Sequence, residues 1–214
     1  MLPQVAEIQK FKRVDGGALV QVFVPGYDPH KRLGAKCEIR FDDGQKISAE
    51  QRRKIFALCR DIANHTGHDV EDLRRNILLI DFLMKHDIEW FSLSNVDMTT
   101  ARLYIEHILE FCFEHDIPLA YETTQMAKEV GTYLFLCLVH RKCACCGEVA
   151  EIHHVDAVGM GRDRTKIDHS EHRLIALCRI HHDLAHREGW KTFSSKRHLD
   201  GIKVTSEMIR RIGL

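Results

Sequence analysis

Cysteine and histidine residues crowd into one stretch of this 214-residue chain. Residues 139–214 hold nine of the 15 histidines and four of the eight cysteines. The densest part, residues 143–190, is poor in large apolar side chains, so it can build little hydrophobic core of its own. Bound metal is the expected source of the missing stability, because metal binding contributes directly to folding. The cluster therefore predicts a metal-stapled domain in the last third of the chain.

The start of the chain favours metal ligands over disulfides. The sequence Met1-Leu2-Pro3-Gln4 lacks the basic-then-apolar pattern of a secretion signal. No run of about 18 apolar residues predicts a membrane span. We therefore expect a cytoplasmic protein without a membrane partner, in which clustered cysteine and histidine bind metal.

Charge divides the chain into two parts. Residues 1–138 carry 17 Lys+Arg and 21 Asp+Glu, a net charge of −4, whereas residues 139–214 carry 14 and 10, a net charge of +4. No Pro/Gly/Ser-rich linker lies between them. This pattern predicts two abutting functional units, 1–138 and 139–214. The overall charge of zero neither favours nor excludes nucleic acid as a partner.

The periodicity of apolar residues predicts an α+β fold with a small N-terminal β-sheet and a helical layer. Residues 19–24 and the alternating residues 37–41 are typical of strands, and Asp15-Gly16-Gly17 is a turn signal. Ser48 and Gln51 form a capping-box pattern that opens a helix, and Gly67 closes it. Further helices are predicted over 71–86, along the stripe 101–112 before Pro118, and along the stripe 126–137. Three cysteines on these stripes are expected to be small core residues: Cys59, Cys112 and Cys137.

Two pairs of ligands at two-residue spacing predict a structural zinc site. Cys143-x-x-Cys146 forms one knuckle and Cys178-x-x-His181 the other. Together they make a tetrahedral Cys3His set that leaves no position for water. Cys145 is an open alternative to Cys146, although it would break the spacing.

A second group of histidines predicts a catalytic metal site. His153 and His154 are neighbours in a short segment with strand character, so their imidazoles should point to opposite faces, one to a metal and one to a substrate. His182 and His186 are four residues apart, so on a helix they share one face and can bind one ion. Three neutral imidazoles with open positions are typical of a catalytic site.

The order of these features resembles the HNH (ββα-metal) endonuclease family. The order is knuckle, strand with a histidine pair, glycine-containing loop, knuckle, and helix with His-x3-His, over about residues 143–190. The resemblance implies a zinc-stapled ββα-metal domain that cleaves DNA. It implies that His154 is the general base and that His153, His182 and His186 bind a catalytic divalent ion, Mg2+, Mn2+ or Zn2+, beside the structural Zn2+.

One position departs from that family. Its middle asparagine, which orients the loop carrying the base, is expected about five residues before Cys178, where this chain has Arg173 beside His172. An imidazole can supply the orienting hydrogen bond and a guanidinium can hold phosphate instead, so both roles stay open. After the glycines, Arg162, Arg164 and Lys166 are candidates for phosphate contacts. His169 and His198 receive no role.

The first unit resembles the NinB (lambda Orf) family of phage recombination mediators. The resemblance covers about residues 45–120 and rests on the stretches 45–55, 65–68, 90–94 and 111–119. It implies a homodimer that binds single-stranded DNA, works with host or phage recombination proteins, and acts in the cytoplasm of a phage host. A basic helix surface with two aromatic residues would suit such binding if they lie close together in the fold, and a solvated helix face with two core aromatic residues is the alternative. The residues concerned are Arg52, Arg53, Lys54, Arg60, Trp90 and Phe91.

The combined prediction is a phage DNA recombination protein that binds single-stranded or branched DNA and cleaves it by a metal-dependent HNH mechanism. The alternative is a non-catalytic single-strand-binding mediator whose zinc module only adds affinity for DNA. A protein–protein adaptor that binds no DNA is a third class, which a salt-dependent gel shift would separate from the others.

Overall fold

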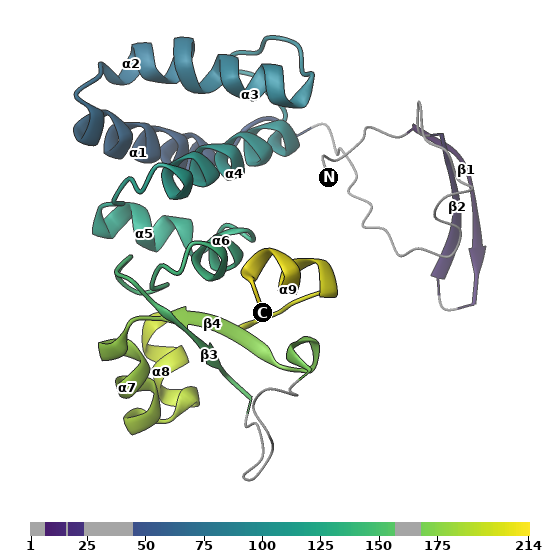
Figure 1. Ribbon diagram of the computed structural model, residues 1–214. Coiled ribbons are helices and arrows are strands. Elements are labelled where there is room, and N and C mark those ends of the chain that lie inside the picture. Colours follow the sequence, from purple (N-terminus) through teal and green to yellow (C-terminus); the bar gives the residue numbers. More distant parts are fainter. Residues whose placement is uncertain (1–6, 16, 24–44, 157–167) are drawn as a thin grey trace. The chain divides into compact units, whose positions relative to one another are not determined.

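The computed structural model describes residues 7–15, 17–23, 45–156 and 168–214. By its internal contacts the chain divides into two compact units, Met1–Phe41 and Asp42–Leu214. Helices predominate and the sheets are small, so the predicted α+β class is confirmed (Figure 1). No helix in the described ranges is both long enough and apolar enough to cross a bilayer.

The first unit contains an antiparallel hairpin of β1 (Glu7–Val14) and β2 (Gly17–Phe23). Val14 pairs with Gly17, so the chain reverses at the predicted turn. The register shifts between Ile8 and Lys10, as at a β-bulge. The predicted strand at 37–41 lies outside the described residues.

The second unit begins with the helix that the capping box predicted. In α1 (Ala49–Thr66) the Gln51 amide donates to Ser48 Oγ, and the Ser48 amide donates to Gln51 Oε1, each at 3.0 Å. Gly67 ends the helix in the left-handed conformation with φ +78°. Ile55, Leu58 and Ile62 are buried, so this helix and its inner face are confirmed.

The predicted helix 71–86 is one helical stretch with a wider central part. It consists of α2 (Val70–Asp72), a π-helical segment (Leu73–Leu78) and α3 (Leu79–His86). The Arg74 carbonyl accepts the amide of Leu79 and also the Tyr104 hydroxyl at 3.1 Å. This hydrogen bond from another helix accompanies the local widening, which apolar periodicity cannot signal.

The helix predicted along the stripe 101–112 is confirmed, but the single helix predicted along 126–137 is wrong because two helices cover this range. The apolar residues of the stripe are all buried in α4 (Met98–Glu114): Ala101, Ile105, Ile108 and Cys112. Residues 126–137, however, are split between α5 (Tyr121–Ala127) and α6 (Tyr133–Val139). Gly131 lies in the break, where a glycine weakens a helix by about 1 kcal/mol. The turn still buries Val130, which is why the stripe looked helical.

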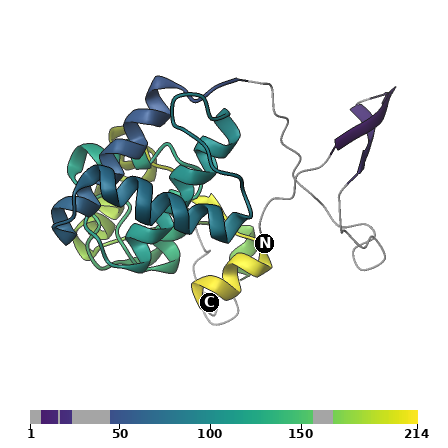
Figure 2. The same cartoon turned by 90° about the horizontal axis from the view of Figure 1, so that it is seen from above.

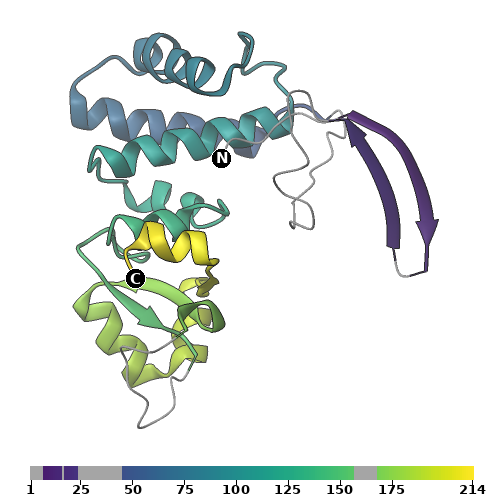
Figure 3. The same ribbon diagram turned by 45° about the vertical axis from the view of Figure 1, so that its right-hand side comes forward.

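The end of the chain forms a three-stranded antiparallel sheet covered by helices. Its order is β3 (Glu151–His154), β4 (Arg173–Leu177) and β5 (Ile202–Lys203). The helices of this region are α7 (Arg179–Glu188), α8 (Trp190–Arg197) and α9 (Ser206–Ile212). Figures 2 and 3 show α9 beside α6, and α7 and α8 together at the sheet. The central strand β4 is buried from Leu174 to Leu177 and therefore belongs to the core of this region.

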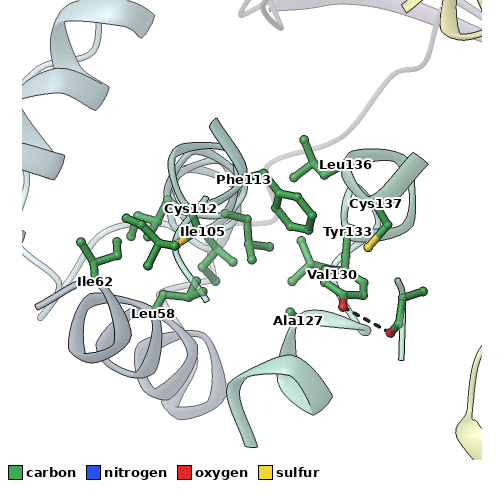
Figure 4. Close-up of a cluster of buried hydrophobic side chains, with 14 of the residues drawn as sticks. Leu58, Ile62, Ile105, Cys112, Phe113, Ala127, Val130, Tyr133, Leu136 and Cys137 are labelled. Carbon is green, nitrogen blue, oxygen red and sulfur yellow. Dashed lines mark hydrogen bonds between the residues drawn. The ribbon is translucent and has the colours of Figure 1, made fainter. Parts of the chain in front are cut away.

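One core joins the helical layer to this sheet. Figure 4 shows side chains from α1, α4, α5 and α6 packed together, and the Tyr133 hydroxyl donates to the Ala144 carbonyl at 3.3 Å. Cys59, Cys112 and Cys137 are at most 1% exposed, as expected of core cysteines. The predicted functional boundary at residue 138 lies inside this unit and stays a prediction.

Candidate metal centres and active site

Two short turns bring four sulfur and nitrogen ligands together. The first turn, 143–147, is closed by the Gly147 amide donating to the Cys143 carbonyl at 2.8 Å, and Gly147 has φ +75°. The Ala144 amide donates to the Ala176 carbonyl at 3.0 Å, which attaches this turn to β4. The second turn starts at Cys178, the N-cap of α7, so both turns are anchored to the same strand and helix.

The distances within this cluster match a tetrahedral zinc ion. Cys143, Cys146, Cys178 and His181 form one group that could hold a metal. With Zn–S of about 2.3 Å and Zn–N of about 2.05 Å, a tetrahedron has S···S edges of about 3.8 Å and S···N edges of about 3.6 Å. The Cys146–Cys178 Sγ atoms are 3.8 Å apart, and the three Sγ atoms lie 3.5, 3.6 and 3.2 Å from His181 Nδ1. Three of these four edges agree with the ideal values to about 0.1 Å and the Cys178–His181 edge is about 0.4 Å shorter, so the donor set fits Zn2+ with a small adjustment.

Cys145 lies beside this group and plays a different part. The pKa of Cys143 is lowered, first because the Cys145 thiol donates a hydrogen bond to it and then because backbone amides do the same. The same hydrogen bond raises the pKa of Cys145, which burial raises further. A low pKa favours the thiolate at Cys143, the form that binds metal, while Cys145 stays a thiol.

Three imidazoles gather on the other side of the same helix. His153, His182 and His186 form a second group that could hold a metal, with one donor atom of each within 4.8 Å of the others. His153 extends from β3, and the other two lie one turn apart on α7. The ring centroids are 4.8 Å apart for His153–His182, 5.1 Å for His153–His186 and 4.7 Å for His182–His186.

The environment of these three rings suits neutral metal ligands. The pKa of His153 is lowered to about 4, mainly by burial and also by the neighbouring His182, His186 and His154. His153 is therefore neutral at physiological pH, which is the form that coordinates metal. His182 Nδ1 is buried and has no hydrogen-bond partner in the part of the chain that the structure describes. The described residues give this group three donors and His186 is exposed, so an ion bound here would have coordination positions beyond the three imidazoles.

His154 lies on the opposite face of β3 from His153. His153 is buried and His154 is half-buried, as the strand alternation predicts. His154 Nε2 lies 3.1 Å from His169 Nδ1, with the rings stacked at 28°, and the His172 ring is edge-on at 5.9 Å. The base candidate is thus part of a histidine cluster separate from the three metal candidates.

Arg173 is held entirely by carboxylates. Its backbone amide donates to Asp156 Oδ2 at 2.9 Å, and its Nη2 donates to Asp156 Oδ1 at 2.8 Å. Its Nη1 donates to both oxygens of Asp200 at 2.9 Å. Because of Arg173, the pKa of Asp156 is lowered to about 2. The guanidinium therefore ties the end of β3 to the start of β5.

Gly201 allows β5 to lie close enough for Asp200 to pair with Arg173. A Cβ at Gly201 would come 2.6 Å from Val155 Cγ2 and 3.0 Å from Arg173 Cβ, so a larger residue would push β5 away. Asp200 also accepts the indole N–H of Trp190 at 3.3 Å, and the Trp190 ring stacks on His153 at 5.6 Å. A chain of contacts thus runs from Arg173 through Asp200 and Trp190 to a metal candidate.

Four residues of this region had no predicted role: Asp156, His169, Trp190 and Asp200. Two of them carried a signal, since Asp156 follows the histidine pair by two residues and Trp190 follows His186 by four residues, just after α7 ends. The other two are distant in sequence from their partners and carried none. Arg162, Arg164 and Lys166 lie outside the described residues. His198 caps α8 in the left-handed conformation, at φ 50°.

The predicted basic surface of the helical layer is arranged differently from the expectation. Lys54 is neutralised by Glu50 at 2.8 Å and Glu129 at 2.6 Å. Phe91 packs edge-on against Phe82 and Tyr104, while Trp90 is 73% exposed. The aromatic residue that lies with the arginines of α1 is Phe56, which no sequence pattern had singled out; these arginines are Arg52, Arg53 and Arg60.

Comparison with known proteins gives one match. A family model described as "Putative HNHc nuclease" matches residues 30–213. Neither a curated protein nor a solved structure matches the chain significantly.

Proposed function

The chain belongs to the family described as putative HNHc nuclease, and from this premise we propose that it is a metal-dependent endonuclease that hydrolyses phosphodiester bonds of DNA. The observation that carries the proposal is the convergence of His153, His182 and His186, with His154 on the reverse face of the same strand. A site that only stapled the fold would not need these four imidazoles.

The sulfur ligands serve stability in this proposal. Cys143, Cys146, Cys178 and His181 would hold Zn2+, since they form the donor set of a structural site. A bound ion would fix the start of α7, on which His182 and His186 stand. The two sites are therefore coupled through one helix.

The three imidazoles hold the catalytic ion, Mg2+, Mn2+ or Zn2+. Bound there, a divalent cation supplies charge neutralisation at the phosphate and stabilises the leaving oxygen. An imidazole ligand carries no negative charge, so His153, His182 and His186 would leave the charge of the ion available to an anionic substrate. Trp190 stacks on His153 and shields one side of its ring from water.

His154 is the proposed general base. A neutral imidazole removes a proton from the attacking water at physiological pH, which makes the water a stronger nucleophile. The contact with His169 restrains the His154 ring, and His172 limits its rotation from the edge. These neighbours orient the base without touching the three metal candidates.

Arg173 takes the orienting role in this proposal, and the alternative role in phosphate binding is set aside. Its guanidinium already donates to Asp156 and Asp200, so few N–H groups are left for a phosphate. Asp156 directly follows the strand with the histidine pair. Arg173 thus restrains the loop that carries the base, the task that asparagine performs in the family it resembles. Phosphate contacts are left to Arg162 and Arg164.

A second candidate is a non-catalytic recombination mediator that binds DNA as a homodimer during phage recombination. It is favoured by the exposed arginines Arg53 and Arg60 of α1, which lie in the region that resembles NinB. The two candidate functions differ in whether the protein cleaves the DNA that it binds. Binding of DNA without any cutting across Mg2+, Mn2+ and Zn2+ would favour the mediator.

The test of the proposed function is relaxation of supercoiled plasmid DNA by the full chain with Mg2+ or Mn2+. We expect nicking by the wild-type protein and its loss in His154→Ala. The matched control is His65→Ala, which removes an exposed histidine of α1 and should cut as the wild type does. Equal cutting by wild type and His154→Ala would remove His154 from the mechanism.

A further inference from the structure

Trp190 packs against the ring of His153, the candidate metal ligand that extends from β3. The two rings stack with their centroids 5.6 Å apart and an angle of 28° between their planes. Gly189 ends α7 at φ +76°, a conformation that favours glycine, and Trp190 follows it as the first residue of α8. The indole therefore limits the orientations that the His153 ring can take.

Two further contacts hold Trp190 itself. The ring of Phe193, which is 0% exposed, lies against it with the centroids 5.6 Å apart. The indole N–H donates to Asp200 Oδ1 at 3.3 Å. The ring and the N–H of Trp190 are thus both engaged within the protein, which favours a role toward His153 over stacking on a base of a nucleic acid.

Asp200 is itself held by two donors besides the indole. Its two carboxylate oxygens accept Arg173 Nη1, each at 2.9 Å, and Oδ1 also accepts the backbone amide of Gly201 at 2.8 Å. The side chain of Asp200 is 58% exposed, and exposed ion pairs contribute little to stability. The carboxylate is therefore better suited to orient Trp190 than to stabilise the fold.

We propose that Asp200 and Trp190 are positioning residues of the imidazole site: the carboxylate holds the indole, and the indole fixes the ring of His153 as a metal ligand. Groups that orient a metal ligand without binding the metal change its affinity by about 10–100-fold. This proposal rests on the proposed function in taking His153 as a ligand of the divalent ion. Both residues act through His153 and not on the substrate.

The experiment measures Mn2+ binding by the full chain, prepared with one zinc ion per chain, from the electron paramagnetic resonance signal of free Mn2+. In Asp200→Ala and in Trp190→Leu we expect the dissociation constant for Mn2+ to rise at least about tenfold. In the double variant Asp200→Ala/Trp190→Leu it should equal that of Trp190→Leu alone. The two effects are not additive in this proposal, because the carboxylate acts through the indole.

Conservative variants separate positioning from a structural role. Asp200→Asn keeps an oxygen that accepts the indole N–H, and it should bind Mn2+ more tightly than Asp200→Ala. Trp190→Phe keeps a ring against His153, and it should bind Mn2+ more tightly than Trp190→Leu.

The fluorescence of Trp190 reports on its position without any metal. In a Trp90→Phe background Trp190 is the single tryptophan of the chain. Asp200→Ala should shift its emission to longer wavelength there, because the released indole becomes more exposed to water. The matched control is Glu207→Ala, which removes one carboxylate from an exposed position of α9 and should change neither the emission nor the Mn2+ dissociation constant.

The proposal is overturned if Asp200→Ala binds Mn2+ as the parent does, if the Trp190 emission is unchanged, or if the two effects add in the double variant. Unfolding of Asp200→Ala in circular dichroism would also overturn it, because the residue would then be structural. Parental Mn2+ affinity in Asp200→Ala, with plasmid nicking by the wild-type protein, would contradict this proposal alone. Weakened Mn2+ binding in Asp200→Ala, without nicking by the wild-type protein, would contradict the proposed function alone.

Discussion

The sulfur site and the imidazole site differ in closure although they share one helix. His181 completes the first group and its neighbour His182 belongs to the second. The sulfur site has four donors, whereas the imidazole site has three among the described residues. Both groups include buried and exposed members, so the number of donors separates them and burial does not. In the proposed function, adjacent residues on α7 therefore serve one closed and one open centre. The closed centre would set the position of the helix, and the open centre would use that position.

The largest effect is expected from a substitution in the sulfur site at the start of the shared helix α7. In Cys178→Ala the sulfur site loses one ligand and the cap residue of α7, so we expect loss of the zinc ion and of the fold around 143–190. The apparent free energy of zinc binding in small domains is about 10–16 kcal/mol, which exceeds the usual stability of a domain. Metal content by mass spectrometry and thermal unfolding measure the effect.

The matched control for that variant is Cys145→Ala, which lies outside the group of four. It should retain one zinc per chain and unfold near the wild-type temperature. Retention of zinc by Cys178→Ala together with its loss in Cys145→Ala would show that the ligand set is wrong.

A large effect on cleavage with no effect on metal is expected at His154. Removing a general base lowers rates by about 10²–10⁴-fold. His154→Ala should therefore lose cleavage by that factor while it keeps its metal content and its melting temperature. Loss of metal from this variant would instead make His154 a ligand of the open site.

An intermediate effect is expected at His186, the exposed ligand of the open site. His186→Ala leaves two imidazoles, and the Mn2+ concentration for half-maximal cleavage should rise at least about 100-fold, since even an outer partner of a metal ligand is worth about 10–100-fold. Zinc in the sulfur site should stay at one per chain. An unchanged Mn2+ requirement would contradict the assignment of His186.

The smallest expected effect is on thermal stability, whose pH dependence comes in part from the pairing of Arg173 with Asp156. The folded pKa of Asp156 is lowered to about 2, so the ionised carboxylate stabilises the folded chain above its unfolded pKa of about 3.9, and this stabilisation is lost as the pH falls toward 2. Arg173→Ala should therefore melt below the wild type at pH 7, with the difference closing between about pH 4 and pH 2. A difference that stays constant over this range would exclude the carboxylate as its source.

Local patterns in the sequence predicted the parts of this structure that depend on near neighbours. The Ser48–Gln51 cap, the Gly67 end of α1 and the two ligand spacings all act within a few residues. The Cys3His group followed from its two-residue spacings and the His182–His186 pair from its four-residue spacing. The choice of His153 as the third imidazole ligand came from the resemblance to the HNH family.

Contacts between distant segments could not be predicted in this way. The pairing of Arg173 with Asp200 joins residues 27 apart, and it depends on the close approach of Gly201 to Val155. The apolar pattern did not reveal the break between α5 and α6, because Val130 is buried although it lies in a turn and not in a helix. The aromatic partner of the α1 arginines was misassigned because Phe56 and Trp90 look alike as isolated aromatic residues, and only packing separates them.

The most direct measurement of the two-site account is an anomalous-diffraction map of crystals grown with Zn2+ and soaked in Mn2+, collected at the absorption edge of each metal. We predict a zinc peak enclosed by Cys143, Cys146, Cys178 and His181, and a separate peak, replaceable by manganese, among His153, His182 and His186. A zinc peak in the sulfur site with no second ion among the three imidazoles at millimolar Mn2+ would contradict the account.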